Sequence, residues 1–509
     1  MGIERRSRRR LLAAALTFLA ATAASPSPWR LSDQDRRALE QVSADSLRGH
    51  LSFLASDALG GRTTPSPGQE IAAEYIAAQF RRAALEPLGL DGYFQNAPAR
   101  IATPVAEGFR FRVAAPERTV EVPAETFQLT TVEGLSIAEA EVVKLPPGPP
   151  GSVEGVAGRV VLTDFDDLPG GPEAFRQRQH WVRALRAGHP ALVVVLSRAL
   201  PVPTDYFSTP VLIEPPSAFP LPGRLVLTSS PELAELYRAL PVGRPAARAT
   251  LSVPEPRIEE TRLRNVAGLL RGSDPALAST YFLLSAHYDG TGEQPGATGP
   301  DRIWNAANDD GSGTTALLEL ASALGTLRPR PRRSIVFIAF FGEEKGLRGA
   351  RYYASHPLVP LASTVALLNL EHLGRTDSTE GRSKAGTASL TGFAYSTLGT
   401  VLEAAGRATG VEVYEDPRRS EAFFASSDNY PLAAAGVVAH TLCVVFEDFE
   451  DYHQPGDEWR KIDFENMERT VRLAGAAALM VADASEPPRW TDAPGAGPFA
   501  EAWRRLRED

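Results

Sequence analysis

The sequence has a single cysteine, Cys443, among its 509 residues. No disulfide can therefore form within the chain, and its stability must come from an apolar core, which a chain of this length can supply. Cys443 lies in the apolar run Thr441–Phe446. We interpret it as a buried strand residue and not as a nucleophile.

The chain also lacks net positive charge, since its net charge is −9. This argues against nucleic acid as a partner, since nucleic-acid binding needs a basic face. After the first 20 residues no segment is apolar enough and long enough for a membrane helix. The segment Gly290-Thr-Gly292 has Pro295 where a dinucleotide-binding motif needs its third glycine. Gly311-Ser-Gly313 lacks the spacing of a serine nucleophile elbow.

The N-terminus has the features of an export signal. Five arginines between positions 5 and 10 precede the apolar run Leu11–Ala20, and small residues follow at 21–24. This pattern predicts a signal peptide over residues 1–24 and a periplasmic or secreted protein. Ser7–Leu12 resembles a twin-arginine signal, although general secretion is an alternative. A plain amphipathic helix is the simplest competing interpretation.

Composition divides the rest of the chain into four parts. Residues 25–119 have helical spacing, and residues 120–255 are rich in proline, valine and short apolar runs. We interpret 120–255 as an inserted β-rich domain, with residues 25–119 and 256–485 forming one main domain. A single large sheet domain is the alternative. Residues 486–509 are expected to be a polar tail.

From residue 265 onward, apolar strand-like runs alternate with amphipathic helices. This alternation predicts a mixed, largely parallel α/β sheet with helices on both faces. The expected strands are Tyr281–Ala286, Ser334–Phe341, Thr364–Leu370 and Thr441–Phe446, and the expected helices are Ser312–Leu327, Tyr395–Thr409 and Phe464–Ala484.

Chemically competent residues follow three of these strands. His287, Glu343, Glu344 and Glu371 each stand at or just past the end of a strand. Ligands of such sheets bind beyond the carboxyl ends of the strands, so we expect these side chains to converge. Imidazole and carboxylate are the ligands of a catalytic metal, which indicates a two-metal hydrolase.

Two acidic residues near His287 complete this part of the pattern. Asp289 lies two positions after His287 and is a candidate to orient the imidazole. Asp309 precedes a predicted helix in a Gly/Ser-rich loop, where it could act as an N-cap. Beside His287 we prefer a carboxylate that bridges two metals.

The adjacent acids Glu343 and Glu344 are expected to have different roles. In an extended segment their side chains point in opposite directions. We assign Glu344 as a metal ligand and Glu343 as the general base.

The remaining ligands come from two further motifs. Glu371 is the preferred terminal ligand, with the adjacent His372 as its competitor. His453 lies in a turn-rich loop and completes the ligand count, and Tyr452 beside it is a candidate oxyanion donor.

These motifs, His287-Tyr-Asp289, Asn308-Asp309, Glu343-Glu344, Asn369-Leu-Glu371 and Tyr452-His453, resemble those of the co-catalytic zinc exopeptidases. That family includes bacterial leucyl aminopeptidase and the glutamate carboxypeptidase II group. The resemblance covers roughly residues 45–485, and it likens residues 120–255 to a protease-associated domain. It implies a peptide substrate and two zinc ions, one held by His287, Asp309 and Glu371, the other by Asp309, Glu344 and His453.

The sequence also departs from the family pattern. The acidic ligand is commonly Asp in this family, and here it is Glu371. No arginine stands near Ala439-His440-Thr441, where carboxypeptidase members carry one, which favours an aminopeptidase over a carboxypeptidase or dipeptidase. A single-zinc glutaminyl cyclase and a catalytically inactive binding protein are two further hypotheses for the function. The oligomeric state does not follow from the sequence.

Overall fold

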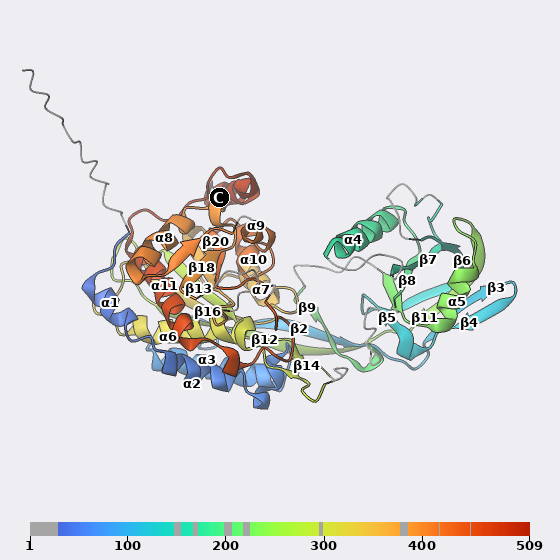
Figure 1. Cartoon of the computed structure of the whole chain (residues 1–509), viewed down its shortest axis with the longest axis horizontal. Helices are drawn as coiled ribbons and strands as arrows, with labels where there is room; N and C mark the ends of the chain where they lie inside the picture. The colour runs from blue at the N-terminus through green and yellow to red at the C-terminus, as the bar shows by residue number, and fades with distance from the viewer. Residues whose placement is uncertain are drawn as a thin grey trace, which may run out of the picture.

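The structure is a computed structural model. It describes residues 29–146, 153, 155–165, 172–197, 206–216, 224–294, 299–376, 385–416, 418–447 and 449–508. The expected signal peptide, residues 1–24, lies outside the described residues. Figure 1 shows two bodies, each built around its own sheet.

The described residues form a main sheet of ten strands. Its order is β19 (Glu412–Tyr414), β18 (Thr387–Leu390), β20 (Ala439–Cys443), β17 (Thr364–Leu370), β13 (Tyr281–His287), β16 (Ser334–Phe340), β12 (Arg257–Leu270), β2 (Phe94–Thr103) and β9 (Val211–Glu214), with β1 (Glu86–Pro87) paired to β12. The central strands β20, β17, β13 and β16 are parallel, whereas β12, β2 and β9 are antiparallel additions. The predicted mixed, largely parallel α/β sheet is confirmed.

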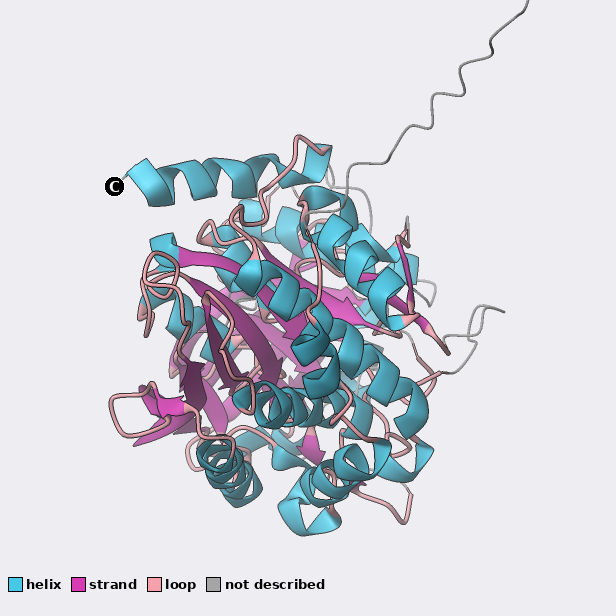
Figure 2. Cartoon of the chain, turned by 90° about the vertical axis from the view of Figure 1, so that its left-hand side faces the viewer, coloured by secondary structure: helices cyan, strands magenta, loops and turns pink. Residues whose placement is uncertain are grey.

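Helices cover both faces of this sheet, as Figure 2 shows. Alternate residues of β13 enter different cores: Phe282 and Leu284 pack into one, and Leu283 packs into the other. Because side chains of a strand alternate between faces, strands buried on both faces must be apolar throughout. This explains the continuous apolar runs of β13, β16 and β17.

The helices of the main body fall into two groups. The first face carries α1 (Asp33–Leu39), α2 (Ala44–Leu54), α3 (Pro67–Arg82), α6 (Ser312–Gly325), α8 (Leu398–Thr409) and α11 (Phe464–Asp483). The second carries α7 (Arg348–Ser355), α10 (Asn429–Ala434) and α12 (Gly497–Glu508). A short helix, α9 (Arg419–Ala422), precedes α10. Serines 32, 43 and 66 cap α1, α2 and α3 by accepting backbone N–H bonds.

The second body is an eight-stranded sheet in the described residues. Its order is β4 (Arg118–Glu121), β3 (Arg110–Ala115), β11 (Pro245–Val253), β6 (Leu135–Lys144), β7 (Val160–Asp164), β8 (Leu192–Leu196), β10 (Leu225–Thr228) and β5 (Phe127–Leu129). Two helices, α4 (Pro172–Ala187) and α5 (Pro231–Ala239), accompany it. Its first strand starts at Arg110, ahead of residue 120, where the sequence texture changes. That this body is a protease-associated domain stays a prediction.

Two long antiparallel strands connect the bodies (Figure 1). β2 pairs with β12 over ten residue pairs, from Phe94–Val266 to Thr103–Arg257. The first six residues of β12 are exposed and its last eight are buried, so the strand leaves the main core toward the second body. β9, which lies between β8 and β10 in sequence, pairs with β2 at the edge of the main sheet. Thus β9, whose neighbours in sequence are strands of the second body, is part of the main sheet.

The segment expected to be a polar tail, residues 486–509, contains the helix α12. Phe499 of this helix stacks on Trp490, with ring centroids 5.4 Å apart, and contacts Phe424 at 5.0 Å. Only a few of its residues are apolar, which is why composition alone suggested a tail. Aromatic packing anchors it to the sheet.

We expect Phe499→Ala to lower the free energy of unfolding by about 2–3 kcal/mol, because it removes a partly buried ring from an aromatic cluster. Urea unfolding followed by tryptophan fluorescence would measure this loss. Arg504→Ala, at an exposed position of the same helix, is the control and should change little. Equal stability of both variants would show that α12 contributes no core packing.

Candidate metal centre

Three neighbouring parallel strands end at the same edge of the main sheet. β13 lies between β17 and β16 and ends at His287. Glu371 directly follows β17, and Glu343 and Glu344 follow β16 after a turn at Gly342, where φ is 67°. His287 is therefore central, with the acids on either side, as the strand-end argument predicts.

Two loops add the remaining predicted ligands. Asp309 lies in the turn Ala307–Gly311 that leads into α6, and His453 lies in the loop after β20. Oδ1 of Asp309 is 3.3 Å from Nε2 of His287, and Oδ2 is 3.1 Å from Nε2 of His453. The two oxygens thus face different histidines, which is the arrangement of a bridging carboxylate and not of a simple helix cap.

The five predicted ligands form two groups that share Asp309. His287, Asp309 and Glu371 form one, and Asp309, Glu344 and His453 form the other. Within each group the potential ligand atoms lie within 4.8 Å of one another. Each group could hold one metal ion.

The hydrogen bonding of these side chains is typical of metal ligands. Both ring nitrogens of His287, Nε2 of His453 and Oε1 of Glu344 are buried without a hydrogen-bond partner among the described residues. Nε2 of His453 lies 3.0 Å from Oε2 of Glu344, yet its direction does not suit a hydrogen bond. Buried polar atoms are almost always satisfied, so the Nε2 atoms of His287 and His453, which lie among carboxylates, are placed as metal-binding lone pairs would be. Nδ1 of His287 faces Asp289 instead.

The electrostatics of the cluster lead to the same conclusion. Burial and the carboxylates of Glu371 and Glu344 raise the pKa of Glu343 well above its usual value. Burial lowers the pKa of His287, but the surrounding carboxylates outweigh it and raise that pKa well above its usual value. Buried carboxylates that repel one another need compensating positive charge.

Glu371 is held in place from one side. Its Oε2 accepts hydrogen bonds from the Ser427 hydroxyl and, at 3.3 Å, from the Asn369 amide. Asn369 is itself held by the Ser285 hydroxyl at 2.8 Å. The other carboxylate oxygen of Glu371, Oε1, lies 3.7 Å from Nε2 of His287. The network leaves one oxygen of Glu371 free for a metal.

The loop that carries Asp309 is held by two groups to which the sequence assigned no role. Asp457 accepts the backbone N–H groups of Asn308 and Asp309 at 2.9–3.1 Å. Arg62 is fully buried and donates to the carbonyls of Tyr288, Asn305, Ala306 and Leu54. Only the structure shows that these two side chains contact backbone groups of this loop.

Asp289 lies behind the imidazole of His287, as predicted. Its Oδ1 is 3.7 Å from Nδ1 of His287, too long for a hydrogen bond, and it accepts the backbone N–H of Glu343 at 3.1 Å. Oδ2 accepts the Thr64 hydroxyl at 3.0 Å. Asp289 therefore connects the loop of the predicted base to the predicted ligand.

Tyr452 packs beside the cluster. Its ring stacks on His453 with centroids 3.9 Å apart. Burial and the nearby carboxylates, Asp309 first among them, raise its pKa, so its hydroxyl stays protonated and can donate a hydrogen bond.

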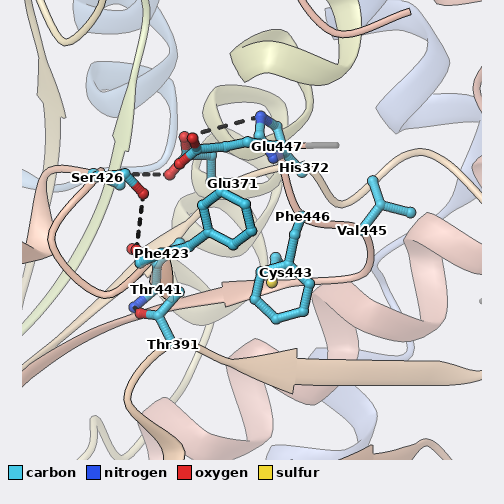
Figure 3. A pocket seen from close by; sticks show the side chains of 11 residues that line it. Glu371, His372, Thr391, Phe423, Ser426, Thr441, Cys443, Val445, Phe446 and Glu447 are labelled. Atoms are coloured by element: carbon cyan, nitrogen blue, oxygen red, sulfur yellow. Dashed lines mark hydrogen bonds and ion pairs between the residues drawn. The ribbon is translucent and has the colours of Figure 1, made fainter. Parts of the chain in front are cut away.

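A small pocket adjoins Glu371 (Figure 3). Phe423, Phe446 and Cys443 supply its apolar lining, and the carboxylates of Glu371 and Glu447 lie at its polar side. Burial raises the pKa of Glu447 to about 7. None of the described residues that line the pocket is Arg or Lys. Cys443 is buried at the end of β20, as expected.

Comparison with known proteins agrees with this geometry. Residues 265–478, which include every predicted ligand, match the model of Peptidase family M28. This segment is thus similar to the M28 peptidases. The match confirms the family resemblance drawn from the sequence motifs.

Curated relatives share parts of the M28 segment. A probable zinc metalloprotease of Leptosphaeria maculans is 32% identical over 129 residues, which are 24% of this chain and 27% of that protein. A vacuolar membrane protease of Penicillium rubens is 39% identical over 92 residues, 18% of this chain and 8% of that protein. The matched part thus spans about a quarter or less of these relatives.

Solved structures resemble the whole chain in fold. The aminopeptidase from Aneurinibacillus sp. strain AM-1 has a TM-score of 0.58 at 20% identity, covering 89% of this chain and 96% of that one. BSAP, a zinc aminopeptidase from Bacillus subtilis, has a TM-score of 0.53 at 19% identity, covering 86% and 94%. At these identities the likeness concerns the fold. None of the helices in the described residues of this chain is long and apolar enough to cross a membrane.

We expect Arg62→Met to lower the free energy of unfolding by at least about 3 kcal/mol, because several buried carbonyls lose their donor together. Urea unfolding of the metal-stripped protein would measure the loss. The matched control is Arg48→Met, at a largely exposed arginine paired with Asp45, which should change stability by less than about 0.5 kcal/mol. Similar losses in both variants would contradict a supporting role for Arg62.

Proposed function

We propose that this protein is an exported aminopeptidase that uses two zinc ions to remove N-terminal residues from peptides. The observation that carries the proposal is the pair of ligand groups sharing Asp309 at the carboxyl edge of the sheet. The names of the relatives, zinc metalloprotease and aminopeptidase, support the same chemistry.

Imidazole and carboxylate donors at these positions suit zinc. His287, Asp309 and Glu371 would hold one ion, and Asp309, Glu344 and His453 the other. When bound, the ions polarise the scissile carbonyl and lower the pKa of water, which makes hydroxide available near neutral pH.

Glu343 is the group that moves the proton. Its Oε2 lies 4.0 Å from Nε2 of His287, so its carboxylate faces the cluster without belonging to either ligand group. Burial favours its protonated form. It would accept a proton from the attacking water at its carboxylate and return it to the nitrogen of the leaving amine. The Tyr452 hydroxyl would donate to the oxygen that becomes negative.

The pocket beside Glu371 favours an aminopeptidase over a carboxypeptidase. Two carboxylates, Glu371 and Glu447, face it, and no described Arg or Lys lines it. Such a pocket attracts an ammonium group and repels a carboxylate. Its apolar side is formed by Phe423 and Phe446.

The N-terminal arginines and the apolar run that follows them support export. The second body, over roughly residues 110–253, would be a protease-associated domain, as the motif resemblance implies.

We expect Glu343→Gln to keep zinc and to lose peptidase activity by at least about a hundredfold, because the amide cannot accept a proton. The assay is hydrolysis of aminoacyl p-nitroanilides with zinc content measured on the same samples. Glu508→Gln, on an exposed part of α12, is the matched control. Full activity of Glu343→Gln would refute its role as base, and wild-type protein without bound zinc or activity would refute the proposed function.

We also expect blocking the substrate amine to abolish cleavage, since the acidic pocket must bind an ammonium group. Leucine p-nitroanilide and its N-acetyl derivative would be compared at equal concentration, with a C-terminally amidated peptide as the control for a carboxylate requirement. Preferential cleavage of the acetylated compound, or loss of cleavage on amidation, would indicate an endo- or carboxypeptidase instead.

A further inference from the structure

His372 has a buried nitrogen that the proposed mechanism leaves unused. Its side chain is 3% exposed, and its Nε2 has no hydrogen-bond partner among the described residues. This nitrogen lies 3.5 Å from Oδ1 of Asp309 and 3.9 Å from Oε1 of Glu371. Figure 3 shows the ring turned toward the Glu371 carboxylate. A buried imidazole nitrogen directed at two ligand oxygens needs an explanation.

The same two oxygens also face His287. Its Nε2 lies 3.3 Å from Oδ1 of Asp309 and 3.7 Å from Oε1 of Glu371. In a tetrahedral zinc site with bonds of 2.0–2.1 Å, neighbouring ligand atoms are about 3.3 Å apart. The four nitrogen–oxygen distances of 3.3, 3.5, 3.7 and 3.9 Å approach that value. The two imidazole nitrogens therefore face the same pair of oxygens, although the group whose atoms all lie within 4.8 Å of one another holds only His287, Asp309 and Glu371.

The backbone at His372 explains how adjacent residues reach the same point. In a continuing strand Glu371 and His372 would face opposite sides of the sheet. His372 instead takes a left-handed conformation with φ of 54°. This region is uncommon for residues other than glycine, because the Cβ atom then crowds the backbone. The rings of Phe449 and Tyr452 pack edge-on against the imidazole, at 5.4 and 5.8 Å, and keep it in place.

We propose that His372 is a fourth protein ligand of the zinc held by His287, Asp309 and Glu371. This inference rests on the proposed function. It makes the two zinc sites unequal: the first would have four protein ligands, whereas the second, with Asp309, Glu344 and His453, would have three. An added protein ligand is expected to hold the first zinc more firmly.

The ligand count can be measured directly by X-ray absorption at the zinc edge of the fully loaded protein. If His287, His372 and His453 each bind one of the two zinc ions, the average is about 1.5 imidazole ligands per zinc. If only His287 and His453 bind, the average is about 1. We expect about 1.5 for the wild type and about 1 for His372→Ala. A wild-type value of 1 would overturn the proposal.

Zinc affinity provides a second measurement. Metal-stripped protein would be titrated with zinc in competition with a chromophoric chelator, which yields two dissociation constants. We expect His372→Ala to weaken one of them by at least about tenfold, since even outer-sphere partners contribute that much. His287→Ala should weaken the same site, and His453→Ala the other. His356→Ala, at an exposed histidine just after α7, is the control and should change neither.

Two outcomes separate this proposal from the proposed function. Two zinc ions bound with affinities that His372→Ala leaves unchanged would refute the fourth ligand alone. No zinc bound by the wild type would refute both. His372→Met, which keeps the side-chain volume, guards against misfolding of the alanine variant. If neither variant folds, the imidazole count of the wild type still decides.

Discussion

The structure depends on an accumulation of buried carboxylates at one edge of the main sheet. Asp289, Asp309, Asp310, Glu371 and Asp428 are each at most 5% exposed there, and Glu343 and Glu344 lie beside them. Arg62, the buried arginine near this cluster, donates its hydrogen bonds to carbonyl groups and not to these acids. So much buried negative charge needs compensation by protons or by cations. Burial raises the pKa of Asp310, Glu343 and Asp428 well above their usual values, and zinc bound among the remaining carboxylates would supply positive charge there.

The position of each ligand follows from two kinds of support. The positions of His287 and Glu371 are fixed by strands, because parallel strands buried on both faces cannot shift without moving the whole core. Asp309 and His453 lie in loops, whose positions need further constraints. Arg62 and Asp457 supply them for Asp309 by occupying backbone groups that would otherwise be buried without partners. The position of Asp309 is thus fixed by hydrogen bonds to the backbone groups around it.

The strand ends and the order of the motifs were sufficient to predict the main sheet and the convergence of all five ligands. Strand Thr364–Leu370 was predicted to the residue, because a run buried on both faces is apolar over its whole length. β2 and the exposed half of β12 were not anticipated, because neither is an apolar run: the buried core residues of β2 are small alanines, and the first half of β12 is polar and exposed. The supporting groups were also missed, since a contact between Arg62 and a carbonyl more than 200 residues away leaves no local signal. Helix α12 was missed although Phe499, Ala502 and Leu506 have helical spacing, because charged and small residues surround them in the sequence.

Two unusual features of the first metal group depend on each other. A glutamate at 371 is one methylene longer than aspartate, so it reaches further from the strand and has more rotamers to restrict. Ser427 and Asn369 restrict it by occupying Oε2, which directs Oε1 toward the point that His287 and His372 also face. With only one carboxylate oxygen available, the site lacks a donor that a bidentate ligand would supply. The left-handed backbone at His372 turns a second imidazole into that position. The inferred role of His372 thus depends on the hydrogen bonds that hold Glu371, because they direct Oε1 toward the point that both imidazoles face.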